Sequence, residues 1–139
     1  MPIALDDKPD LVTVWLGNND ILQQVSLADF QRSMDSILKQ LAADGHPHIA
    51  VANIPNLLLL PRFYSADQTA LKATIKQMNA VIAQEVSTYH DILVDIYSHT
   101  AEVLGHPEYL SGDEFHPSTL GYQLIANLFY EVLMANGII

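Results

Sequence analysis

The fold of this protein is decided by the stretch Leu11-Val12-Thr13-Val14-Trp15-Leu16-Gly17-Asn18-Asn19-Asp20. Its first six residues are apolar on both alternating faces except at Thr13, which is typical of a β-strand covered by helices on both sides. A short buried helix is the alternative, but a glycine followed by three small polar residues favours a turn. In open α/β sheets ligands bind beyond the carboxyl ends of the strands, so Asn18, Asn19 and Asp20 are the first candidates for a functional site.

Length and charge limit the classes to which the protein can belong. The 139 residues suit one domain with one hydrophobic core. Six Lys and Arg stand against sixteen Asp and Glu, which gives a net charge of −10. The basic residues form no patch, so we expect no nucleic-acid partner. The sequence contains no Cys, which excludes disulfides, thiolate nucleophiles and Cys-based zinc sites.

The sequence also predicts neither a membrane-spanning segment nor a signal peptide. No apolar run is long enough to cross a bilayer, and residues 1–7 carry neither a basic region nor a long apolar core. Residues 57–60 are four leucines between two prolines and form the richest apolar patch. We interpret them as a packed loop, with a substrate-facing wall as the alternative. The cellular compartment is left open by these observations.

Hydrophobic periodicity predicts the remaining elements. Ser26 and Ser65 are placed to cap two helices, with Gln68 completing a capping box after Ser65. Alternation of strands and helices predicts a parallel three-layer α/β sheet with right-handed crossovers. The expected elements after the first strand are a helix over 26–43, a strand over 48–54, a helix over 65–88, a strand over 92–96, a short helical or irregular piece over 101–104, a polar loop over 105–117 and a helix over 118–136.

A second polar motif, Asp113-Glu114-Phe115-His116-Pro117, precedes the last predicted helix. In a tight turn, the three-residue spacing lets the Asp113 carboxylate reach Nδ1 of His116 and leaves Nε2 free to take a proton from a nucleophile. The alternative is a helix-capping acid beside a surface histidine. The motif therefore predicts a general base, provided that it lies close to the Gly17–Asp20 turn.

Together the two motifs resemble the third and fifth sequence blocks of the SGNH hydrolases, also called GDSL-type esterases and lipases. Residues 9–20 and 115–122 are similar to that family beyond the motif letters, and the resemblance covers essentially the whole chain. It implies a serine esterase or lipase of three-layer α/β fold that needs no metal or organic cofactor. It also implies that Asn19 is the oxyanion-hole donor, that His116 is the general base oriented by Asp113, and that Gly17 and Asp20 support the turn.

The chain departs from the family pattern at the nucleophile. The family carries its serine in a Gly-Asp-Ser block after the first strand, and a second block supplies a glycine N–H to the oxyanion hole; neither block is found here. The chain therefore resembles the C-terminal portion of an SGNH hydrolase that lacks the first strands. No serine follows an apolar strand in a Gly-Asp-Ser context; the serines are Ser26, Ser33, Ser36, Ser65, Ser87, Ser98, Ser111 and Ser118.

Other polar residues have simpler interpretations. His46-Pro47-His48 has the form of a metal-binding pair, but no third ligand is placed beside it, so we interpret it as a loop. We interpret His90, His99 and His106 as single solvated histidines. Tyr109 and Leu110 are candidates for a pocket wall because they lie just before Asp113.

These observations lead to one expected function and two alternatives. We expect hydrolysis of a small-molecule or lipid ester, with this chain carrying the second half of the catalytic machinery. The alternatives are an inactive remnant that acts as an interaction or partner subunit, and a gene whose nucleophile block is encoded upstream. Because residues 11–16 would lack their neighbouring strand, we expect self-association or pairing with a separate N-terminal fragment through this edge.

Overall fold

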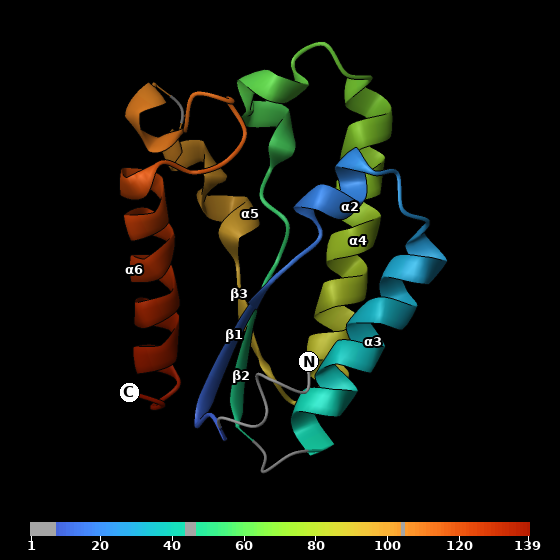
Figure 1. Cartoon of the computed structure of the whole chain (residues 1–139), viewed down its shortest axis with the longest axis vertical. Coiled ribbons are helices and arrows are strands. Elements are labelled where there is room, and N and C mark those ends of the chain that lie inside the picture. Colours follow the sequence, from blue (N-terminus) through green and yellow to red (C-terminus); the bar gives the residue numbers. More distant parts are fainter. Residues whose placement is uncertain (1–7, 44–46, 104) are drawn as a thin grey trace.

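A parallel three-stranded sheet lies at the centre of the computed structural model, which describes residues 8–43, 47–103 and 105–139 (Figure 1). The strands are β1 (Leu11–Trp15), β2 (His48–Ala52) and β3 (Ile92–Val94), in the order β1-β2-β3. Val51 is the partner of Val14 on one side and of Leu93 on the other. The predicted parallel α/β sheet is confirmed, with β1 at one edge.

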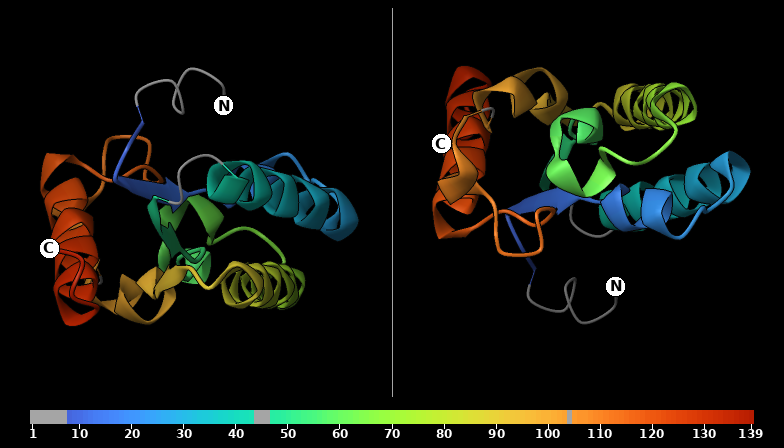
Figure 2. Two further views of the ribbon diagram at one scale, coloured as in Figure 1. Left: turned by 90° about the horizontal axis from the view of Figure 1, so that it is seen from below. Right: turned by 90° about the horizontal axis from the view of Figure 1, so that it is seen from above.

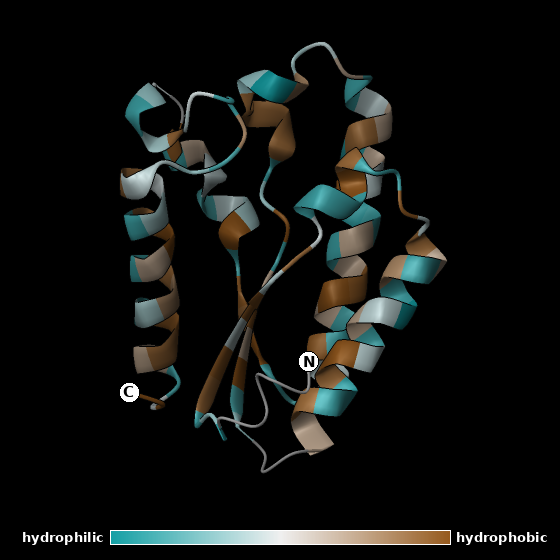
Figure 3. Ribbon diagram, in the orientation of Figure 1, coloured by the Kyte–Doolittle hydropathy of each residue, from teal (hydrophilic) through white to brown (hydrophobic). Residues whose placement is uncertain are grey.

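Helices cover the two faces of the sheet unequally (Figure 2). On one face, α3 (Leu27–Ala43) and α4 (Gln68–Tyr89) pack together and form the larger hydrophobic core with Val14 and Val51. On the other face, α6 (Thr119–Ala135) packs on Ala52 and Val94 in a smaller core. Figure 3 shows that the strands between these layers are largely hydrophobic. The side chains that fill the larger core include Phe30, Met34, Leu38, Leu41, Leu71, Ile75, Met78, Ile82 and Val86.

Two predicted element boundaries differ from the structure because a helix starts earlier than the sequence predicts, after Gly17 in one case and at Asp95 in the other. The predicted turn after β1 is the short helix α2 (Asn18–Leu22). The third strand ends at Val94, because Asp95 accepts a hydrogen bond from the Ser98 N–H and begins α5 (Ile96–His99), followed by the 3-10 helix η3 (Thr100–Val103). This earlier start brings His99 toward the carboxyl end of the sheet.

The predicted cap at Ser65 is wrong. Asp67 caps α4 instead, because its Oδ1 accepts hydrogen bonds from the N–H groups of Thr69 (2.9 Å) and Ala70 (3.0 Å). Gln68 donates to the Phe63 carbonyl oxygen rather than closing a capping box. The predicted cap at Ser26 is confirmed, since its hydroxyl oxygen accepts from the Asp29 N–H. Ser118 caps α6 in the same way, because its hydroxyl oxygen accepts from the Gly121 N–H.

Short 3-10 helices replace two stretches that the sequence predicts as loops. Residues 57–60 contain η1 (Leu57–Leu59), and the buried side chains of Leu57 and Leu60 belong to the larger core, as the packed-loop interpretation predicts. They are followed by η2 (Pro61–Phe63), and η4 (Pro107–Tyr109) interrupts the loop before α6. Within residues 8–43, 47–103 and 105–139, we find no helix that combines the length and the hydropathy needed to cross a bilayer.

Candidate active site

Gly17 sets the geometry of the turn that follows β1. Its φ of +107° lies in the left-handed region, and a Cβ atom at this position would lie 2.6 Å from Cδ1 of Ile54. A side chain is therefore excluded by both conformation and space. The Ile21 N–H donates to the Gly17 carbonyl oxygen at 3.1 Å, so α2 begins at once and carries Asn19 on its exposed side.

The segment that carries His116 is fastened to the start of α6. The Ser118 N–H donates to the Tyr109 carbonyl oxygen at 2.9 Å, and the Ser111 N–H donates to the His116 carbonyl oxygen at 2.8 Å. At Gly121, a Cβ atom would lie 2.1 Å from the Tyr109 oxygen, so only glycine permits this close approach. These contacts fix the backbone on both sides of the histidine.

Asp113 contacts His116 as the sequence predicts. Its Oδ2 lies 2.5 Å from Nδ1 of the imidazole, and both side chains are half-exposed. The other carboxylate oxygen accepts hydrogen bonds from Ser111 Oγ (2.6 Å), His116 N–H (2.9 Å) and Phe115 N–H (3.1 Å). The contacts with His116, then Ser111, hold the pKa of Asp113 far below its usual range. A charged carboxylate at Nδ1 leaves Nε2 as the proton acceptor.

The Phe115 ring packs against the His116 ring. The buried Phe115 ring makes an edge contact with His116, with centroids 4.6 Å apart, and a second edge contact with Phe63 at 5.7 Å. Phe63 belongs to the larger core. The imidazole is therefore in contact with the larger core through the Phe115 ring, which in turn contacts Phe63.

One cavity of about 460 Å³ joins the two predicted motifs. Its walls include Gly17, Asn19 and Asp20 from the first motif and His116 from the second, which lie almost 100 residues apart in the sequence. Tyr109 and Leu110 also line the cavity, which confirms that prediction, as do Leu57 and Leu60. Leu57 and Leu60 therefore contribute to both the larger core and the cavity wall.

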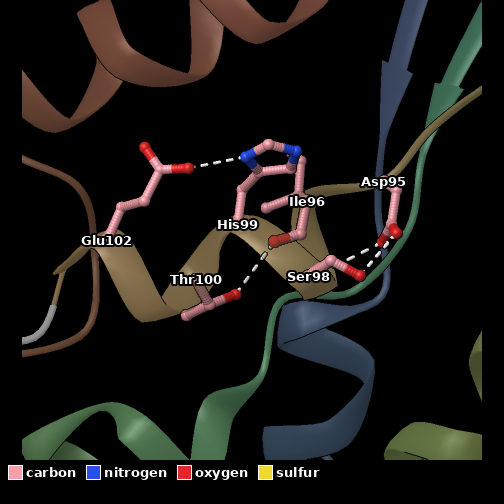
Figure 4. Close-up of polar contacts among 6 residues, drawn as sticks. All are labelled: Asp95, Ile96, Ser98, His99, Thr100 and Glu102. Carbon is pink, nitrogen blue, oxygen red and sulfur yellow. Dashed lines mark hydrogen bonds and ion pairs between the residues drawn. The ribbon is translucent and has the colours of Figure 1, made fainter.

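Sequence reasoning missed a second histidine–carboxylate pair in the cavity wall. Nδ1 of His99 lies 2.6 Å from Oε1 of Glu102, and Figure 4 shows the two side chains next to each other while Thr100 bonds back to the Ile96 carbonyl oxygen. The interpretation of His99 as a lone solvated residue is therefore wrong. The His-x-x-Glu spacing, the reverse of Asp-x-x-His, was the available signal. His106 is likewise paired, with Glu108 at 2.9 Å, but outside the cavity wall.

The cavity wall is acidic and holds no serine. Its charged side chains are Asp20, Glu102 and Glu131, and neither Lys nor Arg is found among the described residues that line it. The described part of the chain contains no group of three His, Asp or Glu side chains placed to bind a metal. His46, from the possible metal-binding pair, lies outside the described residues.

Comparison with known proteins yields one family. The sequence model of the GDSL-like lipase/acylhydrolase family matches residues 1–124. An acetylxylan esterase from Geobacillus stearothermophilus is 26% identical over 136 residues, which cover 91% of this chain and 60% of that protein.

Solved structures show the same fold. The lipase/acylhydrolase from Enterococcus faecalis superposes with a TM-score of 0.70 at 20% identity, over 95% of this chain and 65% of that chain. The acetylxylan esterase Axe2 from Geobacillus stearothermophilus gives a TM-score of 0.73 at 22% identity, over 93% of this chain and 61% of its own. The chain thus spans less than two thirds of the length of these relatives.

Proposed function

We propose that this chain, which belongs to the GDSL-like lipase/acylhydrolase family, contributes the general base and an oxyanion donor to the hydrolysis of an ester by a serine that lies outside these residues. The observation that carries the proposal is the 2.5 Å contact of Asp113 with His116, whose ring lines the same cavity as Asn19. Two groups needed for acyl transfer thereby converge on one space. The family supplies the reaction class.

The chemistry follows from the groups present. Nε2 of His116 takes the proton of the serine hydroxyl as that oxygen attacks the ester carbonyl carbon, and returns it to the leaving alcohol. Asp113 holds the imidazole in the required tautomer and stabilises the imidazolium. The Asn19 side-chain N–H donates to the oxyanion that forms on the carbonyl oxygen. Water then releases the acid from the serine ester by the same steps.

The positions of the serines in this chain argue that the nucleophile is none of them. Ser26 and Ser118 cap helices, and Ser111 donates its hydroxyl hydrogen to Asp113. None of the eight serines lines the cavity in the described part of the chain. The match covers 60% of the acetylxylan esterase and 65% of the Enterococcus faecalis protein. We therefore expect the nucleophile in a segment that corresponds to the part of these relatives outside the match.

Short acyl esters are the proposed substrates. The relatives are named as acetylxylan esterases and as a lipase/acylhydrolase, and an acetyl group is the smallest acyl group among these. We therefore expect activity on acetyl esters. This substrate class comes from the relatives alone.

A fusion protein tests the proposal. The N-terminal part of the Geobacillus acetylxylan esterase, up to the region that matches this chain, is joined to residue 8, and p-nitrophenyl acetate is the substrate. We expect a burst of p-nitrophenol followed by turnover. His116→Ala should lower kcat by about 10⁴-fold or more. The matched control is His106→Ala, because His106 is also paired with a carboxylate but does not line the cavity.

The fusion must fold for this test to count, so far-UV circular dichroism and size-exclusion chromatography accompany the assay. Where the fusion does not fold, the ¹⁵N spectrum of the His116 ring in this chain replaces it: Asp113→Asn should change the ratio of the two neutral tautomers. A folded fusion without activity, or an unchanged tautomer ratio, contradicts the proposal. Activity of the chain alone that depends on His116 would place the nucleophile within it.

An inactive partner subunit is the second candidate function. It is favoured by the absence of a serine from the cavity wall in the described residues. The same fusion separates the two, since a remnant would fold with the added segment and remain inactive.

A further inference from the structure

The segment after β3 brings a second histidine–carboxylate pair to the cavity. His99 and Glu102 both line it, and both side chains are half-exposed. Asn19 follows β1 whereas His99 follows β3, and β2 lies between these strands. Two strand spacings separate the starts of the two segments by roughly 10 Å. The pair therefore lines a part of the cavity beyond the carbonyl group that we assign to Asn19.

Buried polar side chains hold α5 against the end of β2. The buried Asn53 side chain donates to Oδ1 of Asp95 at 2.7 Å and accepts from the Tyr97 N–H at 2.8 Å. The hydroxyl oxygen of Thr100, which is also buried, accepts from the Asn56 N–H at 2.9 Å. Hydrogen bonds in a buried network of this kind fix the backbone that makes them. The histidine on this turn is therefore held in one place in the cavity wall.

The contact with Glu102 determines which hydrogen bond His99 can offer a ligand. Nδ1 lies 2.6 Å from Oε1 of Glu102, and Figure 4 shows the second ring nitrogen on the side of the ring away from that carboxylate. When Nδ1 donates to the carboxylate, Nε2 of the neutral imidazole is an acceptor. The ring therefore suits a ligand group that carries a hydrogen-bond donor.

The rest of the wall limits the charge of that ligand. Its charged side chains besides Glu102 are Asp20 and Glu131, and no Lys or Arg lines the cavity among the described residues. These carboxylates repel an anion. Apolar side chains such as Leu124 and Leu128 complete the wall, and a hydroxyl group costs less to bury among them than an ammonium ion. A neutral hydroxyl group is the donor that fits best.

We propose that Nε2 of His99, oriented by Glu102, accepts a hydrogen bond from a hydroxyl group on the alcohol part of the ester. The inference deepens the proposed function and rests on it. Because the proposed acyl group is short, the part of the substrate that extends from Asn19 to His99 is the alcohol. His99 thereby selects alcohols that carry a hydroxyl group several atoms from the ester bond, and it takes no part in proton transfer.

Two esters of equal length measure this selection in the active fusion. 4-Hydroxybutyl acetate and pentyl acetate differ only in a terminal hydroxyl group that replaces a methyl group. His99→Ala should lower the ratio of their kcat/KM values about fivefold, because one neutral hydrogen bond is lost. His106→Ala is the matched control, since His106 is also paired with a carboxylate but lies outside the cavity wall. This control should leave the ratio unchanged.

Glu102 is tested as a positioning residue through the tautomer of the ring. In Glu102→Gln an uncharged amide replaces the carboxylate at Nδ1, so the ¹⁵N spectrum of His99 should show a larger fraction of the tautomer with its proton on Nε2. The same variant should lower the ratio of the two esters about twofold. Glu108→Gln is the control and should change the tautomers of His106 alone.

Binding to the 139-residue chain tests the inference without catalysis. Millimolar 4-hydroxybutyl acetate should shift the ¹⁵N resonance of Nε2 in His99. Pentyl acetate at the same concentration should shift it less than about half as much, because its methyl group cannot donate a hydrogen bond. The ring of His106 should respond to neither ester.

Equal shifts of the His99 resonance with the two esters, or an unchanged ratio in His99→Ala, would overturn the inference. So would a fall in kcat by the same factor for both esters in His99→Ala, because His99 would then act in proton transfer. A folded fusion without activity rejects the proposed function, and the resonance shifts in the chain alone then decide whether His99 binds a hydroxyl group. An active fusion whose ratio is independent of His99 rejects only the hydroxyl site.

Discussion

The two faces of the sheet show opposite relations between sequence and burial. On the face covered by α3 and α4, the residues that repeat with helical spacing are the ones that are buried, such as Ile75 and Ile82. On α6, the large apolar side chains of Tyr122, Tyr130 and Met134 are exposed. The difference is that the apolar side chains of α3 and α4 are mostly buried, whereas several large apolar side chains of α6 are exposed in the described chain. Stability should therefore reside on the first face and function on the second.

The largest effect expected is on the α3/α4 face. Ile82 is fully buried, so Ile82→Ala should lower the free energy of unfolding by about 2–5 kcal/mol. Leu124→Ala on α6 removes a partly exposed side chain, and should cost less than about 1 kcal/mol in the same chain. Urea denaturation followed by circular dichroism measures both. Equal losses would mean that α6 is as tightly packed as α4 and would remove the contrast between the faces.

Catalysis should depend on the residues that line the cavity rather than on the α3/α4 core. In an active fusion, Asn19→Ala should lower kcat by about 10²–10³-fold through lost stabilisation of the oxyanion, with little change in stability because Asn19 is exposed. Asn136→Ala, at the far end of α6, should leave kcat unchanged. Steady-state rates and thermal melts are the measurements. A fall in kcat of less than tenfold for Asn19→Ala would argue against its role.

Much of this arrangement could be predicted from local chemistry. The strands at 11–16 and 48–54, the inner stripe of α4 and the Asp113–His116 contact depend on hydrophobic spacing and a three-residue turn, which are visible in the sequence. Asp67 and Asp95 were missed as helix caps because several polar residues compete at each helix start, and the backbone decides which one accepts the hydrogen bonds.

The cavity could be predicted only in part. Its polar ends follow from the two motifs, because the carboxyl ends of parallel strands share one edge of a sheet. The His99–Glu102 pair had a local signal in its three-residue spacing, but its place in the cavity wall depends on where β3 stops. The remaining walls come from segments far apart in the sequence and are a tertiary feature with no local signal.

Gly17 lines the cavity and packs against the larger core, so we expect its replacement to have an intermediate effect on stability. In Gly17→Ala the new Cβ would meet Ile54 of the larger core, at a φ of +107° that alanine rarely adopts. We expect a loss of about 1–3 kcal/mol in the free energy of unfolding. The control is Gly112→Ala, where a Cβ would meet nothing within 4 Å, so its effect should stay within about 0.5 kcal/mol. Thermal or urea unfolding of both variants measures the difference.

The smallest effects expected concern pH, and two carboxylates should act with opposite signs. Burial raises the pKa of Asp91 to about 6, with His90 lowering it slightly, whereas the unfolded value is about 3.9. Between about pH 4 and 6 the unfolded chain loses this proton first, so stability falls as pH rises, by no more than about 1 kcal/mol after solvent screening. Asp91→Asn should remove this fall.

Asp113 should give the reverse dependence. Its pKa is held far below the usual range by His116 and Ser111, so its contribution to stability is present above the unfolded value of about 3.9 and is lost as pH falls below it. Asp113→Asn should therefore flatten the acid side of the stability curve, while Asp91→Asn flattens the region between pH 4 and 6. Urea midpoints of both variants and the parent, measured from pH 3 to 7, distinguish the two. If both variants ran parallel to the parent over this range, neither carboxylate would differ in proton affinity between the folded and unfolded chain, and the contacts of Asp113 would not stabilise its charge.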